Sequence, residues 1–375
     1  MKRKLLLVLS VILVLSLCVG CGQPAAETAE PAPEPAAPAQ EPAGEPEPAA
    51  EPAPDLGSFS FTLSSHDPAT SEIMLYKQRW ADAIKEATGG NVEITIYGTG
   101  TIAAAGDVVD VVKAGGADLG WVMTGFFPGQ YQLTEVLGLP MQGFGDNRAS
   151  TETLWDLYEE YPAVSDEWSD FKLLMVYANP GNTFGTSTRP VAKVSDLAGL
   201  NMRCPAGPIT SVMSAWGGNP IGMPPGDIYQ SLERNNIDGW VWETAGAVSF
   251  SVPEVTNYYT KMEMYNMVFA LVMNKQAWDS LPAEYQEIID GMSGREASVG
   301  AAQAFYDAVI RANGIITDMG GEFIDVTPED QAEFKIEADK FAATWADGVT
   351  ADLDAQAYLA KANEQVAKYN AQYAG

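Results

Sequence analysis

The arrangement of apolar and polar residues along this chain alternates between two periods. Apolar residues occupy every second position from Phe59 to Ser64, which predicts a strand, and the same period returns from Asn91 to Tyr97. Between these segments, after Ser71, apolar residues recur at helical spacing. Gly89 and Gly90 then end the expected helix. This order predicts a β-α-β unit.

Strands and helices continue to alternate toward the end of the chain. Glycine-rich turns join the first of them, which is typical of an open, mostly parallel sheet with ligands at the carboxyl ends of its strands. Strands late in the chain are expected to return to the sheet that earlier strands form. This predicts two α/β lobes joined by crossing segments that form a hinge. Further strands are expected at 119–123, 171–177, 200–203, 237–242, 268–273 and 322–326, and further helices at 106–113, 154–161, 225–232, 282–319, 328–346 and 353–369.

The first 21 residues have the pattern of an export signal. A basic start at Met1–Lys4 precedes an apolar run at 5–17 that is too short to span a bilayer comfortably. Gly20 before Cys21 resembles the bacterial lipobox, in which the cysteine is lipidated, although Cys18 stands where that motif usually has leucine. We expect 1–21 to be a lipoprotein signal peptide with Cys21 as the lipidated residue, and an ordinary signal peptide is the alternative.

Residues 22–56 differ in composition from everything that follows. They are mostly Pro, Ala and Glu and nearly lack large apolar side chains, so burial cannot offset the entropy lost on ordering. We therefore expect an extended tether that holds the domain at 57–375 away from a membrane surface.

Charge and composition exclude several classes of function. The chain has 50 acidic against 21 basic residues, and this balance disfavours nucleic acid as a partner. Three cysteines, of which only Cys204 follows the signal, provide no disulfide framework and no cysteine metal site. His66 is the single histidine, and no nucleophile or zinc motif surrounds it. Neither a cofactor, a metal site nor catalysis is expected.

The segment 194–243 contains the most informative candidate residues. Arg203 ends an apolar strand and can offer parallel N–H groups to a carboxylate, although a surface salt bridge is the alternative. Trp240 and Trp242 are two positions apart on a strand and so face one side, where core packing is the alternative to ligand contact. Glu243 follows at the end of this strand. The pattern favours a site for a small acid.

Two other segments place candidate residues at the carboxyl edge of the expected first sheet. His66 follows the first strand, where a plain turn residue is the alternative, and Met123 and Thr124 end the strand that begins at Leu119. The prolines before the helix at 225–232 would expose free N–H groups to an anion or would simply initiate the helix.

Several motifs in collinear order resemble the DctP-type solute-binding subunit of tripartite ATP-independent periplasmic (TRAP) transporters. They are TGGNVEITIYGTGTI at 88–102, VVDVVKAGGADLGWV at 108–122, VSDLAGLNMRCP at 194–205 and IGMPPGDIYQSLERNNIDG at 221–239. LGLPM at 137–141 and LPAEYQEII at 281–289 are weaker matches. The resemblance extends from about Phe59 to the C-terminus.

This resemblance implies a two-lobed α/β fold of the periplasmic-binding-protein kind (type II-like), with two open, mostly parallel sheets flanked by helices and a long crossing helix. Lobe I would comprise about 57–180 and 268–312, and lobe II about 181–267 and 313–375. Such a protein is not an enzyme. It closes on a small-molecule carboxylate outside the cytoplasm and delivers it to the small and large integral membrane subunits of the transporter, driven by an ion gradient.

The resemblance also assigns roles to residues. The family's substrate-gripping arginine falls on Arg203, and other pocket positions fall on His66, Met123, Trp242, Asn266 and Met267. Thr183 stands where sialic-acid-binding members have a basic residue, and Trp242 stands where they tend to have asparagine. These differences favour a smaller, partly apolar or aromatic acid. Glu243 leaves open that a cation bridges the acid to the protein.

Two other classes of function remain open from the sequence. The protein could serve an ABC permease or a sensor instead of a TRAP permease, because nothing in the chain identifies the membrane partner. An exported hydrolase or lyase would have to use His66 with a carboxylate, and the missing nucleophile and metal motifs disfavour it.

Overall fold

The computed structural model describes residues 56–374. The predictions for the signal peptide, the lipidation of Cys21 and nearly all of the tether fall on residues 1–55 and lie outside the described residues. Within 56–374, no helix is both long enough and apolar enough to cross a membrane.

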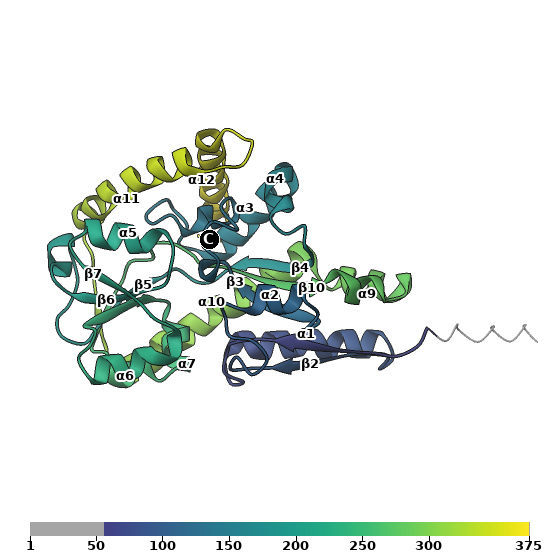
Figure 1. The fold of residues 1–375 in the computed structure, drawn as a ribbon. Helices are drawn as coiled ribbons and strands as arrows, with labels where there is room; N and C mark the ends of the chain where they lie inside the picture. The colour runs from purple at the N-terminus through teal and green to yellow at the C-terminus, as the bar shows by residue number, and fades with distance from the viewer. Residues whose placement is uncertain (1–55, 375) are drawn as a thin grey trace, which may run out of the picture. The chain divides into compact units, whose positions relative to one another are not determined.

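The first sheet has five strands in the order β2-β1-β3-β10-β4 (Figure 1). Strand β1 runs parallel to β2 and β3, whereas β10 runs antiparallel to both β3 and β4. The β-α-β unit predicted at the start is present, and the Ser71 hydroxyl caps its helix by accepting the N–H of Met74. The strands are β1 (Phe59–Ser64), β2 (Val92–Tyr97), β3 (Leu119–Met123), β4 (Phe171–Ala178) and β10 (Val268–Asn274).

The second sheet has six strands in the order β11-β9-β5-β8-β6-β7. Strands β6, β7 and β8 pair in parallel, and β5 runs antiparallel to its neighbours β8 and β9. The strands are β5 (Thr183–Thr186), β6 (Asn201–Cys204), β7 (Asn219–Gly222), β8 (Gly239–Trp242), β9 (Tyr258–Thr260) and β11 (Glu322–Ile324).

Both sheets are thus mixed, and the prediction of mostly parallel sheets needs correction at β5 and β10. The reason is connectivity. Only a few residues separate β4 from β5 and β9 from β10, and these short links lead directly from one sheet into the other. Because the chain leaves the first sheet along β4 and returns along β10, these two neighbouring strands run in opposite directions, as β5 and β9 do in the second sheet.

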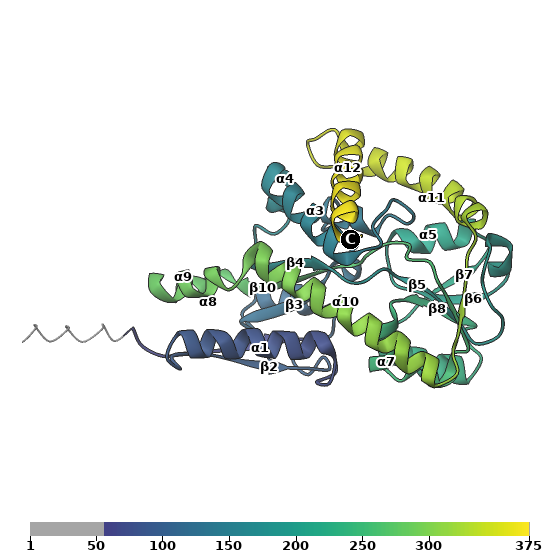
Figure 2. The same ribbon diagram turned by 180° about the vertical axis from the view of Figure 1, so that it is seen from behind.

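Helices cover both sheets in a way that matches the expected α/β class (Figures 1 and 2). They are α1 (Glu72–Ala87), α2 (Val108–Lys113), α3 (Asn147–Glu160), α4 (Pro162–Asp166), α5 (Pro208–Ala215), α6 (Ile228–Glu233), α7 (Thr244–Ser249), α8 (Lys275–Asp279), α9 (Ala283–Gly291), α10 (Gly294–Asp318), α11 (Pro328–Gly348) and α12 (Ala355–Tyr373).

The expected long helix at 282–319 is two helices. Helix α9 ends at Gly291, and α10 starts at Gly294, whose φ of +72° is a left-handed value that favours glycine. Helix α10 then runs from β4 and α3 of the first sheet to α7 beside the second (Figure 2). It therefore spans both lobes.

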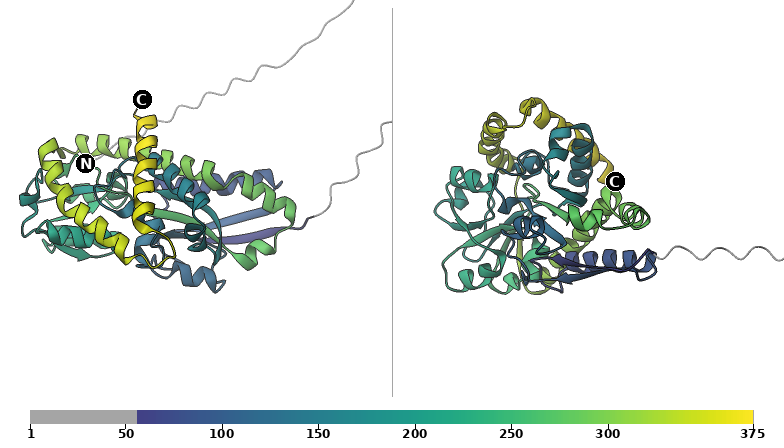
Figure 3. Two further views of the ribbon diagram at one scale, coloured as in Figure 1. Left: turned by 90° about the horizontal axis from the view of Figure 1, so that it is seen from above. Right: turned by 45° about the vertical axis from the view of Figure 1, so that its right-hand side comes forward.

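The last two helices connect the lobes from another side. Helix α11 packs against α5, and α12 packs against α3 (Figure 3). Tyr358, Leu359 and Val366 of α12 share a buried cluster with Trp155 and Leu157 of α3. The division into lobe I and lobe II at the residues given above stays a prediction. Helix α12, which that prediction assigns to lobe II, packs against α3, which flanks the first sheet.

Candidate functional site

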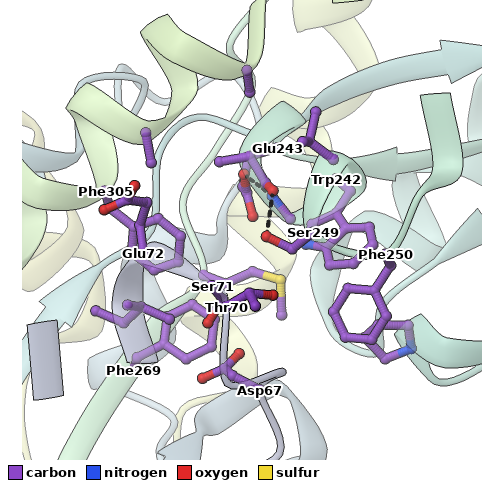
Figure 4. Close-up of a pocket in the computed structure, with 18 of the residues that line it drawn as sticks. Asp67, Thr70, Ser71, Glu72, Trp242, Glu243, Ser249, Phe250, Phe269 and Phe305 are labelled. Atoms are coloured by element: carbon purple, nitrogen blue, oxygen red, sulfur yellow. Dashed lines mark hydrogen bonds between the residues drawn. The ribbon is translucent and has the colours of Figure 1, made fainter. Parts of the chain in front are cut away.

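A cavity of about 450 Å³ lies where the two sheets and α10 meet. The first sheet contributes the segment after β1 and the ends of β3 and β10, and the second contributes β6, the end of β8 and α7. Figure 4 shows side chains of both lobes facing one another across it. The carboxyl ends of β1, β3, β6 and β8 all lie here, as the topology of an open α/β sheet requires.

Arg203 is the buried cation of this cavity. It lies on β6 between β7 and β8, and only 2% of its surface is exposed. Its Nε donates to the Met223 carbonyl at 3.2 Å and its Nη1 to the Val241 carbonyl at 3.2 Å. Burial lowers the pKa of Arg203 to about 10, so it remains charged at neutral pH.

No ion pair within residues 56–374 includes Arg203. The two carbonyls accept from Nε and Nη1, and Nη2 has no hydrogen-bond partner among these residues. The surface salt bridge that the sequence left open is therefore wrong. A buried cation without a counter-ion is costly, and a ligand carboxylate would offset that cost.

The tryptophans Trp240 and Trp242 have different positions. Trp242 is partly buried, lines the cavity and lies 5.5 Å from the Arg203 guanidinium, measured from Cζ to the ring centroid. It also contacts Phe250, which lines the same wall (Figure 4). Trp240 is fully buried, and its Nε1 donates to the Thr256 hydroxyl at 3.0 Å.

His66 lines the cavity from the turn that follows β1. Its ring stacks on Trp121 with centroids 4.6 Å apart. Burial lowers the pKa of His66, so the imidazole is neutral at pH 7. Its buried Nδ1 has no hydrogen-bond partner among the described residues. Such an atom is suited to a bond with a polar group of a ligand.

A buried ion pair lies next to Trp121, the ring on which His66 stacks. Lys77 of α1 is buried, and its Nζ lies 2.9 Å from Asp67 Oδ2, 2.7 Å from the Ser65 hydroxyl and 3.6 Å from the Trp121 ring centroid. Asp67 itself lines the cavity. Lys77 thus compensates Asp67 and fixes the indole on which His66 stacks.

Glu243 lines the cavity from the other lobe, and 3% of its surface is exposed. It is the N-cap of α7, where its Oε2 accepts the N–H of Gly246 at 2.7 Å. Burial, and to a smaller extent the charge of Asp67, raises the pKa of Glu243 to about 7. A second pair, Arg311 of α10 with Glu72 of α1 at 2.9 Å, also borders the cavity and is partly exposed.

Six of the residues predicted from the sequence meet in this cavity: Arg203, His66, Met123, Trp242, Glu243 and Met267. Four do not line it: Thr124, Thr183, Trp240 and Asn266. Thr124 and Asn266 border a smaller pocket, Thr183 borders another beside Thr260, and Trp240 lies in the core. Their side chains engage in hydrogen bonds with the protein, which explains why they are not turned toward the cavity.

Several lining residues were missed. Trp121, Phe269 and Phe305 form an aromatic wall, and Asp67 and Phe250 line other parts of the cavity. Trp121 and Phe269 lie inside apolar strands, where nothing distinguishes a lining residue from a core residue. Asp67 could have been predicted as a lining residue from the sequence, because it directly follows His66 at the same sheet edge.

No group of three or more His, Cys, Asp or Glu side chains within 56–374 is arranged to hold a metal ion.

Two α/β lobes joined by crossing segments, with a largely apolar cavity and a buried cation between them, define the periplasmic-binding-protein fold and a receptor for small solutes. The chain belongs to the DctP family, described as bacterial extracellular solute-binding protein, family 7, whose model matches residues 63–347. Membership makes it an extracytoplasmic binding protein of the TRAP type rather than an enzyme, as the sequence predicted.

Characterised relatives are distant. The 2,3-diketo-L-gulonate-binding periplasmic protein YiaO of Escherichia coli is 24% identical over 242 residues, which are 64% of this chain and 74% of that protein. A monocarboxylate 2-oxoacid-binding periplasmic protein of Nostoc is 29% identical over 216 residues, 56% of this chain and 58% of that protein. The latter match thus spans less than two thirds of the Nostoc protein.

Solved structures show the same fold. A TRAP solute-binding protein of Bordetella bronchiseptica with bound (R)- and (S)-mandelate has a TM-score of 0.76 and 25% identity, covering 83% of this chain and 99% of that one. One of Rhodoferax ferrireducens with copurified benzoate has a TM-score of 0.79 and 22% identity, covering 84% and 99%.

Proposed function

We propose that this protein is the solute receptor of a TRAP transporter and that Arg203 grips the carboxylate of its ligand. The observation that carries the proposal is the buried guanidinium, which lines a cavity between the lobes and has no counter-ion within 56–374. Bidentate binding of a carboxylate would supply both the missing charge and partners for the remaining N–H groups.

The body of the ligand is apolar or aromatic. Trp121, Trp242, Phe250, Phe269 and Phe305 contribute rings to the walls, whereas few uncharged polar groups face the space. A sugar acid with many hydroxyls would leave several of them without partners. The mandelate-bound and benzoate-bound relatives support an aromatic acid, since they share this fold.

Binding to the purified protein tests this assignment. We expect acids with an aromatic or branched apolar body to raise the melting temperature, because they bind only the folded state. Arg203→Met should weaken their binding by about a hundredfold, since it removes a shielded charge-assisted contact. Arg234→Met, at an exposed arginine that follows α6, is the control and should bind normally. Equal binding by wild type and Arg203→Met would disprove the assignment.

We further propose that the receptor is anchored by lipid at Cys21 and delivers its ligand to the two integral TRAP subunits. The basic and apolar N-terminus, Gly20 before Cys21 and the tether-like composition of 22–56 support the anchor. Cys21→Ser should abolish metabolic labelling with palmitate and release the protein from the membrane fraction. If the unchanged chain takes up no label, the sequence is an ordinary signal peptide.

A further inference from the structure

The charged side chains around the cavity fall into two groups. Asp67 and Glu72 each have a cationic partner, Lys77 and Arg311 respectively, both at 2.9 Å. These two pairs are balanced within the protein. They add no net charge for a ligand to neutralise.

Arg203 and Glu243 form the second group. Both line the cavity, both are at least 97% buried, and neither belongs to an ion pair within residues 56–374. They do not form an ion pair with each other either. The cavity therefore contains one uncompensated cation and, apart from it, one uncompensated carboxyl group.

Capping explains only part of the environment of Glu243. The backbone N–H groups of Gly246 and Ala245 give it neutral partners, which satisfy hydrogen bonds without balancing a negative charge. Asp, Asn, Ser or Thr would cap α7 at least as well. A glutamate that reaches into a ligand cavity without an ionic partner creates a region of negative potential.

We propose that the ligand is amphoteric: its carboxylate binds Arg203, and a protonated amine binds Glu243. This rests on the proposed function, since Arg203 must hold the acid. Arg203 and Glu243 then each receive an opposite charge from one molecule, and the two internal ion pairs remain intact. Figure 4 shows Glu243 and Asp67 on different walls, with Phe269, Phe305 and Trp242 around the space.

A neutral group in place of the amine fits this environment less well. A hydroxyl could donate one hydrogen bond to Glu243, but a buried negative charge would stay uncompensated or would have to take up a proton. The aromatic rings also attract an ammonium group through their π faces. With a cavity of about 450 Å³, the chemical class is an amino acid with an aromatic or bulky apolar side chain, or a similarly sized cyclic zwitterion.

Matched pairs of acids that differ in one polar group test the proposal. Mandelate is compared with phenylglycine, phenyllactate with phenylalanine, and 3-(hydroxymethyl)benzoate with 3-(aminomethyl)benzoate, by isothermal titration at pH 8 on the purified protein. We expect the amino member of at least one pair to bind about tenfold or more tightly than its hydroxy partner.

Variants at one position separate this recognition from the carboxylate clamp. Glu243→Gln keeps an oxygen that can accept the Gly246 N–H but removes the charge. It should abolish the preference for the amino member, because the amino acid loses an opposite charge whereas the hydroxy acid loses at most one hydrogen bond. Glu243→Asp retains the charge and should keep part of the preference. Glu233→Gln, an exposed glutamate at the end of α6, is the matched control and should behave as wild type.

The outcomes distinguish this inference from the proposed function. If the hydroxy acids bind and no amino partner binds more tightly, the inference is wrong while the carboxylate clamp stands. Binding of acids that requires added Na⁺ or Ca²⁺ and disappears with a chelator or on desalting would mean that a metal cation occupies the place of the amine, which also overturns it. If Arg203→Met binds all these acids as wild type does, the proposed function fails as well.

Discussion

At the scale of single residues, neighbours with the same chemistry have different tasks. Trp240 and Trp242 follow one another on the same side of β8, yet Trp240 contacts Tyr259 and Thr256 in the core, whereas Trp242 reaches the cavity. Alternation along a strand determines the side to which a residue points but not its distance from solvent. The core-packing alternative is thus realised at Trp240.

Alanine substitutions should separate these two tasks. Trp240→Ala removes a fully buried ring and should lower the free energy of unfolding by about 3–5 kcal/mol, with ligand affinity little changed in the folded protein. Trp242→Ala should cost less stability but weaken ligand binding about tenfold or more, because the ring borders the cavity. Denaturant unfolding and titration calorimetry measure the two effects. A larger loss of affinity in Trp240→Ala would contradict this division.

The sequence predicted Arg203, His66 and Glu243 of the cavity but missed most of its aromatic wall. Arg203 and His66 stand out because their residue types are rare in an acidic chain with one histidine. Trp121, Phe269 and Phe305 do not, since apolar residues inside strands and helices are usually core, and only the three-dimensional arrangement of β3, β10 and α10 exposes them to one cavity.

Glu135 should make stability depend on pH. Burial, together with the charge of Glu167, raises its pKa to about 8. The folded protein therefore holds a proton that the unfolded chain releases at about pH 4.3. Between these values the native state binds more protons, so stability falls as the pH rises, by at most about 1.4 kcal/mol per unit from this group. Above pH 8 the contribution is constant.

Glu135→Gln should remove this slope. The variant should gain stability relative to wild type as the pH rises from 5 to 8, as measured by urea unfolding at several pH values. The comparison with wild type cancels the contribution of Glu243, whose pKa is also raised. A difference between the two proteins that does not change with pH would show that Glu135 is ionised in the folded state.

At the scale of elements, the second sheet depends on one close contact. Gly185 of β5 lies opposite Trp240 of β8, and a Cβ on Gly185 would overlap the indole ring.

The sequence predicted β8 but not β5, because Thr183–Thr186 is too short for its periodicity to be visible. The same limit explains why β7, β9 and α7 were missed, and with α7 the capping role of Glu243.

Gly185→Ala should therefore destabilise the protein by about 1–3 kcal/mol or more, since either β5 or the ring must move. Gly222→Ala in β7 of the same sheet is the control, because its Cβ would meet nothing within 4 Å, and it should stay within about 0.5 kcal/mol of wild type. Adding Trp240→Leu to Gly185→Ala should recover part of the loss in denaturant unfolding. Strictly additive effects would contradict a direct clash.

At the scale of the whole described domain, two crossing segments connect the lobes and carry a buried polar network. Asn266, between β9 and β10, donates from Nδ2 to the carbonyls of Asn179 at 2.7 Å and Gly145 at 3.1 Å. Its Oδ1 accepts the Ser150 hydroxyl of α3 at 2.5 Å. Asn179 Oδ1 in turn accepts the N–H of Met267 at 2.6 Å. The network ties both crossings to one helix.

Family resemblance placed Asn266 in the ligand pocket, whereas its hydrogen bonds tie it to the segments that cross between the lobes, where the sequence predicts a hinge. A hinge residue affects binding through the fraction of molecules that can close, because apparent affinity falls with that fraction. Asn266→Ala should lower stability by about 2–4 kcal/mol, since it leaves buried partners unsatisfied. It should also weaken every ligand by a similar factor, about three- to tenfold.

The order of preference among ligands distinguishes the two roles of Asn266. If it acts at the hinge, a panel of acids should bind Asn266→Ala in the same order as wild type, because the residues that line the cavity are unchanged. Trp242→Ala, which alters the cavity wall, should change that order. Titration calorimetry with the same panel on the three proteins provides the comparison. A changed order in Asn266→Ala would instead mean that this amide contacts the ligand, as the resemblance implied.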